Sequence, residues 1–372
     1  MQSFQESNLI LDELKRALTQ MGFTKPTDVQ RQAIPIALES RDLMVSSQTG
    51  SGKTIAFLIP LLTGLLKNRE FAGLILVPTR ELAMQVYNVL VDISKHCPAM
   101  SGVVLVGGTP MGPQLRKLQK GPRVIIATPG RLLDHLRRRS ANLNKVSYFV
   151  LDEADRMFDM GFIGQLKQIA AQLPRERQNL LFSATFPPEV KKLAQSLLRN
   201  PFEISLQKVQ AAPVEIEQKV LEVSHDKKNN EVLNTLNTTQ GSTLIFARTQ
   251  HRADRLAKYL HNFGISVSLI HGGRTQGQRN RSIADFRSGV SRVLVATDVA
   301  SRGIDVPHVA YVLNYDVPQC PEDYIHRIGR TGRAGQKGQA LSFVTREDRK
   351  TWALITRKTG NKAQMVYSQN LR

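Results

Sequence analysis

The residues best placed for chemistry form a glycine-rich loop, residues 46–54 (SSQTGSGKT), between apolar segments at 43–45 and 55–59. A loop between a strand and a helix turns backbone N–H groups around phosphates, and the helix N-terminus adds partial positive charge. Lys53 is spaced to reach the β- and γ-phosphates, and the Thr54 hydroxyl is spaced to help hold Mg²⁺. The loop therefore predicts binding of a nucleoside triphosphate, although Ser47 stands where the strict pattern has glycine.

A group of acids follows a second apolar segment, residues 148–151, about a hundred positions later. It consists of Asp152, Glu153 and Asp155. Taken alone, the loop could be an ordinary turn and the acids a solvated loop. Because both groups leave apolar segments in this order, we expect one site that binds and hydrolyses the nucleotide.

The elements that must position these residues alternate along the whole chain. Short apolar segments without polar alternation predict parallel sheets covered on both faces. We expect strands at 43–45, 73–77, 102–106, 124–127, 148–151, 179–182, 242–246, 266–270, 293–296, 309–314 and 338–343, with helices such as 80–95, 113–119, 250–263 and 276–286 between them. Segment 205–217 lacks a helical face and holds Pro213, so we predict α/β domains at 1–205 and 217–372 joined by a linker at 206–216.

Composition narrows the class of protein. The 372 residues contain no run of the ~20 apolar residues that a membrane span needs. The first six residues lack the basic start and apolar core of a secretory signal. Cys97 and Cys320 lie far apart in the sequence, which disfavours a disulfide, and the eight His form no cluster with zinc-ligand spacing. We therefore expect a cytoplasmic protein.

The net charge of +20 is spread over both halves and predicts a polyanionic partner. Aromatic residues make up only 6%, which favours contacts to backbone phosphates over base stacking. The second half has no phosphate loop but carries three Arg within residues 326–333 (HRIGRTGR). These could form a solvated basic loop; we favour the interpretation that Arg330 and Arg333 face the triphosphate as arginine fingers.

The ordered set of motifs resembles the DEAD-box ATP-dependent RNA helicases over nearly the whole chain. The matching segments are 22–30 (GFTKPTDVQ, resembling the Q motif, with Phe4 upstream), 46–54, 78–83 (PTRELA), Gly107 with Gly108, 128–131 (TPGR), 152–155 (DEAD), 183–185 (SAT), 244–249, Gln276 with Arg279, 296–305 and 326–333. The resemblance implies two tandem RecA-like α/β domains, each a mostly parallel sheet flanked by helices, that close on ATP and RNA. The compact core with a short linker is similar to the bacterial RhlE-type group.

The resemblance also implies a nucleotide site. Gln30 would read the adenine edge, with Phe4 or Phe23 packing on the base and Thr27 beside it. Asp152 would hold Mg²⁺ through water with Thr54, and Glu153 would act as general base. The loop residues are Ser47, Gln48, Thr49, Gly50, Ser51, Gly52, Lys53 and Thr54; from the second domain come Gly303, Asp305 as a ribose contact, His326, Arg330 and Arg333.

RNA would be contacted mainly through its sugar-phosphate backbone, because hydroxyls, glycines and Arg donate to phosphate without reading bases. The implied contacts are Thr79, Arg80, Gly108, Thr128, Gly130, Arg131, Arg248, Thr249, Gly272, Arg279 and Thr297. Each alone could be a helix cap or a turn residue. The basic segment after Arg131 resembles the family helix that bends one RNA strand. Ser183, Thr185 and Arg302 would couple the nucleotide and RNA sites.

Two other functions stay open at this stage. A DNA-translocating helicase has the same two-domain construction, and no residue here proves recognition of a 2′-hydroxyl. An ATP-gated RNA clamp that rarely turns over is the second alternative. The presence of Glu153, Arg330 and Arg333 favours an active enzyme.

Overall fold

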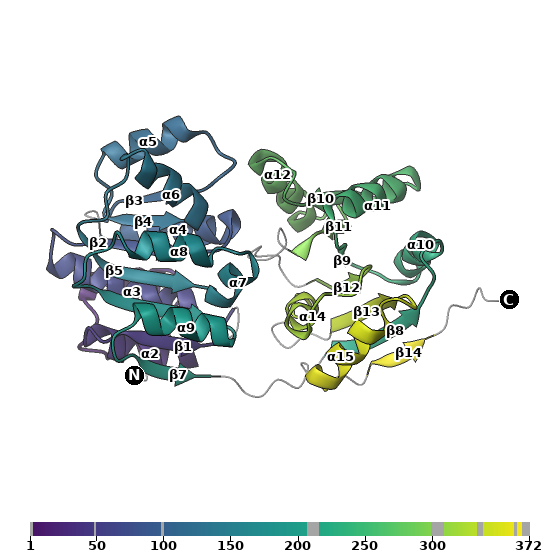
Figure 1. Ribbon diagram of the computed structural model, residues 1–372, viewed down its shortest axis with the longest axis horizontal. Coiled ribbons are helices and arrows are strands. Elements are labelled where there is room, and N and C mark those ends of the chain that lie inside the picture. The colour runs from purple at the N-terminus through teal and green to yellow at the C-terminus, as the bar shows by residue number, and fades with distance from the viewer. Residues whose placement is uncertain are drawn as a thin grey trace. The chain divides into compact units, whose positions relative to one another are not determined.

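The computed structural model describes residues 3–47, 50–97, 100–206, 216–298, 309–332, 338–360 and 363–366. The chain divides into two compact units, Met1–Lys208 and Val209–Arg372 (Figure 1). Each unit is built around a sheet of seven strands.

Unit 1 has the strand order β3-β4-β2-β5-β6-β1-β7, and every neighbouring pair is parallel. Its strands are β1 Leu43–Ser46, β2 Ala72–Leu76, β3 Gly102–Leu105, β4 Val124–Ala127, β5 Val146–Asp152, β6 Gln178–Ser183 and β7 Phe202–Ser205. Its helices are α1 Asp12–Gln20, α2 Asp28–Leu38, α3 Lys53–Lys67, α4 Arg80–Ser94, α5 Met111–Gln119, α6 Pro129–Arg137, α7 Ala154–Asp159, α8 Ile163–Ala170 and α9 Pro188–Leu197.

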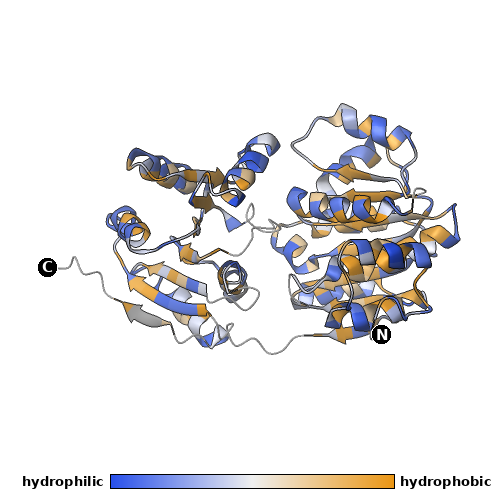
Figure 2. Ribbon diagram, turned by 180° about the vertical axis from the view of Figure 1, so that it is seen from behind, coloured by the Kyte–Doolittle hydropathy of each residue, from blue (hydrophilic) through white to orange (hydrophobic). Residues whose placement is uncertain are grey.

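The sheet of unit 1 separates two hydrophobic cores. Successive residues of a strand point to opposite faces, so Ile75 joins one core while Leu74 and Leu76 join the other. Figure 2 shows strands that are hydrophobic along much of their length and helices with mixed surfaces. This burial on both faces explains why apolar runs without alternation identified the strands.

Unit 2 repeats the architecture, with the order β10-β11-β9-β12-β13-β8-β14 and parallel pairing throughout. Its strands are β8 Ile216–Glu222, β9 Thr243–Phe246, β10 Val267–Ile270, β11 Val293–Ala296, β12 Tyr311–Asn314, β13 Gly338–Val344 and β14 Gln364–Val366. Its helices are α10 Lys228–Thr238, α11 Gln250–Asn262, α12 Gln276–Arg287, α14 Pro321–Ile328 and α15 Arg349–Thr359. Counted from the first strand of each unit, the strand order of the two sheets is the same.

The α/β class and the parallel sheets predicted from the sequence are confirmed. Three strands near the sheet margins, β7, β8 and β14, were not predicted. Strand β8 begins at Ile216, the last residue of the predicted linker, where it pairs with Gly338. Its polar centre, Glu217 to Lys219, lacks the apolar run that marks a central strand. Linker residues 207–215 lie outside the described residues.

No helix among the described residues combines the length and the apolar character needed to cross a membrane.

Candidate functional site

In each unit most of the predicted site residues follow the carboxyl ends of the strands, where ligands bind in open parallel sheets. In unit 1 the phosphate loop follows β1 and the acids lie at and after the end of β5, while the predicted RNA contacts follow β2, β3 and β4. The predicted base contacts Phe4, Phe23, Thr27 and Gln30 precede β1. Strand β6, between β5 and β1, ends at Ser183, which was predicted to couple the two sites. The strand order therefore places both sets along one edge of a single sheet.

The phosphate loop is shaped by two glycines with left-handed backbone. Gly50 has φ 82° and Gly52, which precedes helix α3, has φ 94°. Lys53 is the first residue of α3, and its Nζ donates to the carbonyl of Ser47 at 3.3 Å. The same ammonium lies 3.8 Å from Oδ1 of Asp152. The structure thus brings together the loop and the acid that the sequence placed about a hundred positions apart.

Asp152 ends strand β5 and is 2% exposed. Burial raises the pKa of its carboxyl to about 6; the charge of Lys53 opposes this shift and that of Glu153 adds to it. Asp152 and the half-buried Thr54 offer the oxygen donors that Mg²⁺ prefers. One carboxylate and one hydroxyl fit an ion that brings water and phosphate oxygens as its remaining ligands.

The raised pKa of Asp152 predicts a pH-dependent cost to stability. The folded protein holds this proton up to about pH 6, whereas an unfolded chain releases it near pH 4. The free energy of unfolding should therefore fall as the pH rises through that window, because the folded state binds the proton more tightly than the unfolded chain does. Urea unfolding without nucleotide or Mg²⁺ should show this fall in the wild type, and Asp152→Asn should lack it. A constant difference between the two proteins from pH 4 to 7.5 would contradict the assignment.

Gln30 connects helix α2 to the phosphate loop. Its Nε2 donates to the Gly52 carbonyl at 3.0 Å, and its Oε1 accepts from the Thr27 backbone N–H at 2.9 Å. Gln30 is 1% exposed, and each end of its amide bonds a protein group. The amide keeps a second N–H and a second acceptor position, so its contact to the base stays a prediction.

Of the two aromatic residues predicted to pack on the base, Phe4 is corrected by the structure. It has no exposed surface and belongs to the same hydrophobic core cluster as Leu14 and Leu18 of helix α1. Phe23 is half-buried against the same core, and Thr27 is exposed. Phe23 therefore remains the candidate for stacking.

The close approach of Gln30 to Gly52 predicts a large effect of a single methyl group. A Cβ on Gly52 would lie 2.5 Å from Nε2 of Gln30 and 2.9 Å from Oγ1 of Thr27. A Cβ on Gly50 would meet none of the described atoms within 4 Å, although the backbone there is equally left-handed. We expect Gly52→Ala to weaken binding of a fluorescent ATP analogue about tenfold more than Gly50→Ala does. Equal losses in the two variants would mean that backbone strain alone matters.

Glu153 has left-handed backbone at φ 56° and occupies the N-cap position of the short helix α7 without a side-chain cap bond. Its carboxylate forms a buried ion pair with Arg156, a partner that the sequence did not suggest. Asp155, in the first turn of α7, accepts from the backbone N–H and the hydroxyl of Thr185 at 2.8 and 2.9 Å. The Asp155 N–H donates to Oγ of Ser183. Segments 152–155 and 183–185 are therefore hydrogen-bonded to each other.

The RNA contacts predicted in unit 1 gather beyond β2, β3 and β4. The Arg80 guanidinium rests on Gly108, where a Cβ would lie 1.8 Å from its Nη1. Nη1 of Arg131 donates to the Thr109 carbonyl at 3.1 Å. Burial lowers the pKa of the Arg131 guanidinium, and the charge of Arg80 acts in the same direction. The guanidinium groups of Arg80 and Arg131 thus form a cationic cluster with a glycine backbone beside it.

The small residues among the predicted RNA contacts of unit 1 differ in whether they have a structural role. Thr79 caps helix α4 by accepting from the Leu82 N–H at 3.3 Å, so the structural role considered for it is real. Thr128 precedes helix α6 but makes no side-chain cap bond. Gly130, in the first turn of α6, leaves a Cβ position 3.5 Å from Oε1 of Gln165.

Unit 2 places its predicted RNA contacts after β9, β10 and β11, the counterparts of β2, β3 and β4. Thr249 caps helix α11 by accepting from the Arg252 N–H. Arg248 donates from Nη2 to Asp348 at 3.0 Å. Gly272 is exposed, while Thr297 and Arg279 are buried. Gln48, Thr49, Arg302, Gly303, Asp305 and Arg333 lie outside the described residues.

Helix α14 and the residues directly after it contain nucleotide contacts that were predicted in unit 2. His326 is half-buried, and Arg330 is 8% exposed directly beyond the helix end. Between them, Arg327 forms a bidentate ion pair with Asp298, in which Nε and Nη2 donate to the two carboxylate oxygens at 2.6 and 2.7 Å. Arg327 was part of the recognised run but was given no role. It ties the helix to the segment that follows β11.

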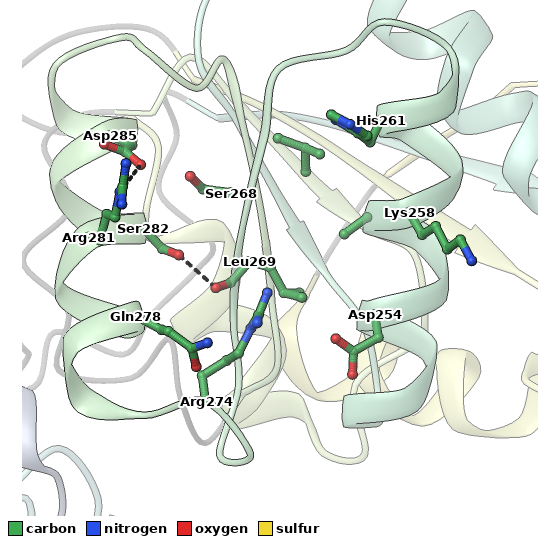
Figure 3. Close-up of a pocket in the computed structure, with 12 residues that line it drawn as sticks. Asp254, Lys258, His261, Ser268, Leu269, Arg274, Gln278, Arg281, Ser282 and Asp285 are labelled. Atoms are coloured by element: carbon green, nitrogen blue, oxygen red, sulfur yellow. Dashed lines mark hydrogen bonds and ion pairs between the residues drawn. The ribbon is translucent and has the colours of Figure 1, made fainter.

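Helices α11 and α12 border a pocket of about 570 Å³ (Figure 3). It lies over the edge strand β10 between helices α11 and α12. Asp254, Lys258, Arg274 and Asp285 are among its lining residues, and Ser282 closes one side by donating to the Leu269 carbonyl. None of its lining residues was predicted to belong to the site.

Two family models match the chain. The one described as DEAD/DEAH box helicase matches residues 27–193, and the one described as helicase conserved C-terminal domain matches residues 227–335. The chain is 43% identical to DEAD-box ATP-dependent RNA helicase 30 of Arabidopsis thaliana over 94% of this chain and 60% of that protein. It is 41% identical to DEAD-box ATP-dependent RNA helicase CshA of Bacillus subtilis over 99% of this chain and 75% of that protein. Plant and bacterial relatives match about equally well, so the RhlE-type subgroup stays a prediction.

Solved structures agree with these relationships. S. cerevisiae Dbp5 bound to RNA and ADP BeF3 matches with a TM-score of 0.87 at 35% identity, covering 100% of this chain and 97% of that one. Mss116 bound to ssRNA and UDP-BeF matches with a TM-score of 0.88 at 31% identity, covering 98% and 79%. The predicted RecA-like fold of both units is confirmed.

Proposed function

This chain belongs to the DEAD/DEAH box helicase family, and from that membership we propose that it is an ATP-dependent RNA helicase. It hydrolyses ATP in response to RNA and uses the cycle to separate or remodel short RNA duplexes or ribonucleoproteins. One observation carries the proposal. A single sheet edge holds the Lys53–Asp152 pair beyond β5 and β1 and the Arg80–Arg131 cluster beyond β2 and β4. A nucleotide and a polyanion can therefore bind side by side on unit 1.

The proposed chemistry assigns one task to each group. Lys53 and the loop N–H groups bind the triphosphate, and Asp152 with Thr54 holds Mg²⁺, which supplies neutralisation of phosphate charge. Glu153 orients the attacking water and accepts its proton. From unit 2, Arg330 and Arg333 stabilise the charge that develops on the γ-phosphate, with His326 and Asp305 completing the site.

RNA binding is proposed through the phosphate backbone. The Arg80–Arg131 cluster and the Thr128 hydroxyl suit such contacts because they donate without reading base identity. Helix α6, with basic residues in its last turn, would bend one strand. The Asp155 bonds to Ser183 and Thr185 support a relay between nucleotide and RNA. ATP and RNA would each favour closure of the two units, so each should strengthen binding of the other by about 1–3 kcal/mol.

The proposed location is the cytoplasm. Neither Cys97 nor Cys320 is part of a disulfide bond, which suits a reducing compartment.

The direct test compares matched duplexes of about ten base pairs, one of RNA and one of DNA, with ATP and Mg²⁺. The proposal expects ATP-dependent separation of the RNA duplex and little separation of the DNA duplex. Equal rates would favour the DNA helicase reading. Tight, ATP-dependent RNA binding without separation, and with turnover that RNA leaves unchanged, would favour the ATP-gated clamp.

A further inference from the structure

Unit 2 contains a buried lysine and aspartate close in the fold to where unit 1 has Lys53 and Asp152. The two sheets share one strand order, and the helix after the first strand begins with lysine in both: α3 at Lys53 and α10 at Lys228. In unit 1 the fifth strand ends at Asp152, and in unit 2 Asp316 lies two residues beyond the fifth strand, β12. The segment before Lys228, residues 223–227 (VSHDK), has none of the glycines of a phosphate loop.

Lys228 is bound entirely by protein groups. Its side chain has no exposed surface, and its Nζ donates to the Tyr315 carbonyl at 2.7 Å and to Oδ1 of Asp316 at 3.2 Å. The ammonium also lies 5.1 Å from the centre of the Tyr315 ring. Burial lowers the pKa of Lys228, and Asp316 opposes that shift. An ammonium held in this way is not presented to a phosphate.

Asp316 in turn fixes the connection between β9 and α11. Its Oδ2 accepts from the Arg248 backbone N–H at 2.9 Å, and its Oδ1 pairs with Arg252 at 3.0 Å. Its own N–H donates to the carbonyl of Phe246, the last residue of β9. This turn carries Arg248 and Thr249, both of which were predicted to contact RNA.

We propose that Lys228 and Asp316 form a positioning ion pair that holds the β9–α11 turn in the conformation that binds RNA. The proposal rests on the RNA helicase function proposed above. Lys228 neutralises the Asp316 carboxylate, whose side chain is 1% exposed. The neutralised carboxylate can then stay buried and accept from the Arg248 backbone N–H of the turn. Lys228 and Asp316 are thus positioning residues, and they act on RNA through Arg248 and Thr249.

The pair depends on charge balance. Removing one partner of a buried ion pair leaves the other charge without compensation, which disrupts the surrounding contacts. Without Lys228, the Asp316 carboxylate would keep Arg252, whose side chain is 31% exposed and therefore partly solvated. The turn would then lose its fixed geometry while the nucleotide residues of unit 1 remain unchanged.

The test measures RNA-stimulated ATPase activity of the full chain with a poly(U) RNA, recording the half-saturating RNA concentration, KM for ATP and Tm. Lys228→Met is compared with Lys227→Met, which removes the same charge from the exposed neighbouring residue. We expect Lys228→Met to raise the half-saturating RNA concentration about tenfold without changing KM for ATP. Lys227→Met should resemble the wild type. In Lys228→Met/Asp316→Asn the concentration should return toward the wild-type value, because Asn can still accept from the Arg248 N–H without a buried charge.

Several outcomes would overturn the inference. They are a folded Lys228→Met protein with unchanged RNA dependence, a change confined to KM for ATP, and a double variant no better than the single one. If Lys228→Met does not fold, Arg252→Met removes the other basic partner of Asp316, which is partly exposed. This variant must then itself raise the half-saturating RNA concentration. A wild type without any RNA stimulation would overturn the proposed function as well, whereas a stimulated wild type with an unaffected variant overturns this inference alone.

Discussion

Replacing Glu153 by Gln is expected to reduce kcat for ATP hydrolysis by about 10²–10⁴-fold, the range for loss of a general base. An amide cannot accept the proton of the attacking water. It can still accept a hydrogen bond from Arg156, so the buried contact of Glu153 is largely kept. Binding of ATP and RNA should therefore persist. Steady-state ATPase rates at saturating RNA, together with RNA anisotropy titrations, measure the two effects separately.

Glu189→Gln is the matched control for this substitution. Glu189 is exposed in the first turn of α9, and its replacement should leave kcat unchanged. If Glu153→Gln retains full turnover, another group activates the water. Loss of nucleotide binding together with turnover would instead mean that Glu153 serves the local structure through Arg156.

Replacing Arg330 by Ala is expected to slow ATP turnover by about 10³-fold, at the lower end of what arginine fingers contribute. The residue lies in unit 2, one position beyond the helix cap Gly329, and its backbone carbonyl accepts from the Val309 N–H at 3.2 Å. Because the phosphate loop belongs to unit 1, binding of an ATP analogue should change little. Single-turnover ATPase rates and analogue titrations distinguish these effects.

Arg346→Ala provides the control, since Arg346 is an exposed arginine of the same unit. Arg330→Lys should recover only part of the rate, because an ammonium keeps the charge but loses the planar fork. If Arg330→Ala turns over ATP as fast as Arg346→Ala does, the second unit does not complete the catalytic site through this residue.

Much of the fold was predictable because central parallel strands are buried on both faces. Segments such as 124–127 and 293–296 therefore appear as plain apolar runs. Strand β8 was missed for the opposite reason, since its polar centre carries no such signal. The phosphate loop was predictable because its function depends on neighbouring residues in the chain.

The contacts that organise the site were less accessible to sequence reasoning. The bonds of Asp155 to Thr185 and of Lys228 to Asp316 join residues that are 30 and 88 positions apart. In each unit, the order of the strands in the sheet brings the two residues of the pair together. Phe4 was misjudged because an isolated aromatic can serve a ligand or a core, and burial decides between the two. The bond from the Gln30 amide to the Gly52 carbonyl was not predicted either, and the contact of Gln30 to the base stays a prediction.

The central claim is that ATP hydrolysis on unit 1 is coupled to RNA. It is tested most directly by the ATP turnover rate of the wild-type chain measured with and without RNA, at saturating ATP and Mg²⁺. We expect RNA to raise kcat at least about tenfold and matched single-stranded DNA to leave it unchanged. A turnover rate that is the same with RNA, with DNA and with neither would contradict it.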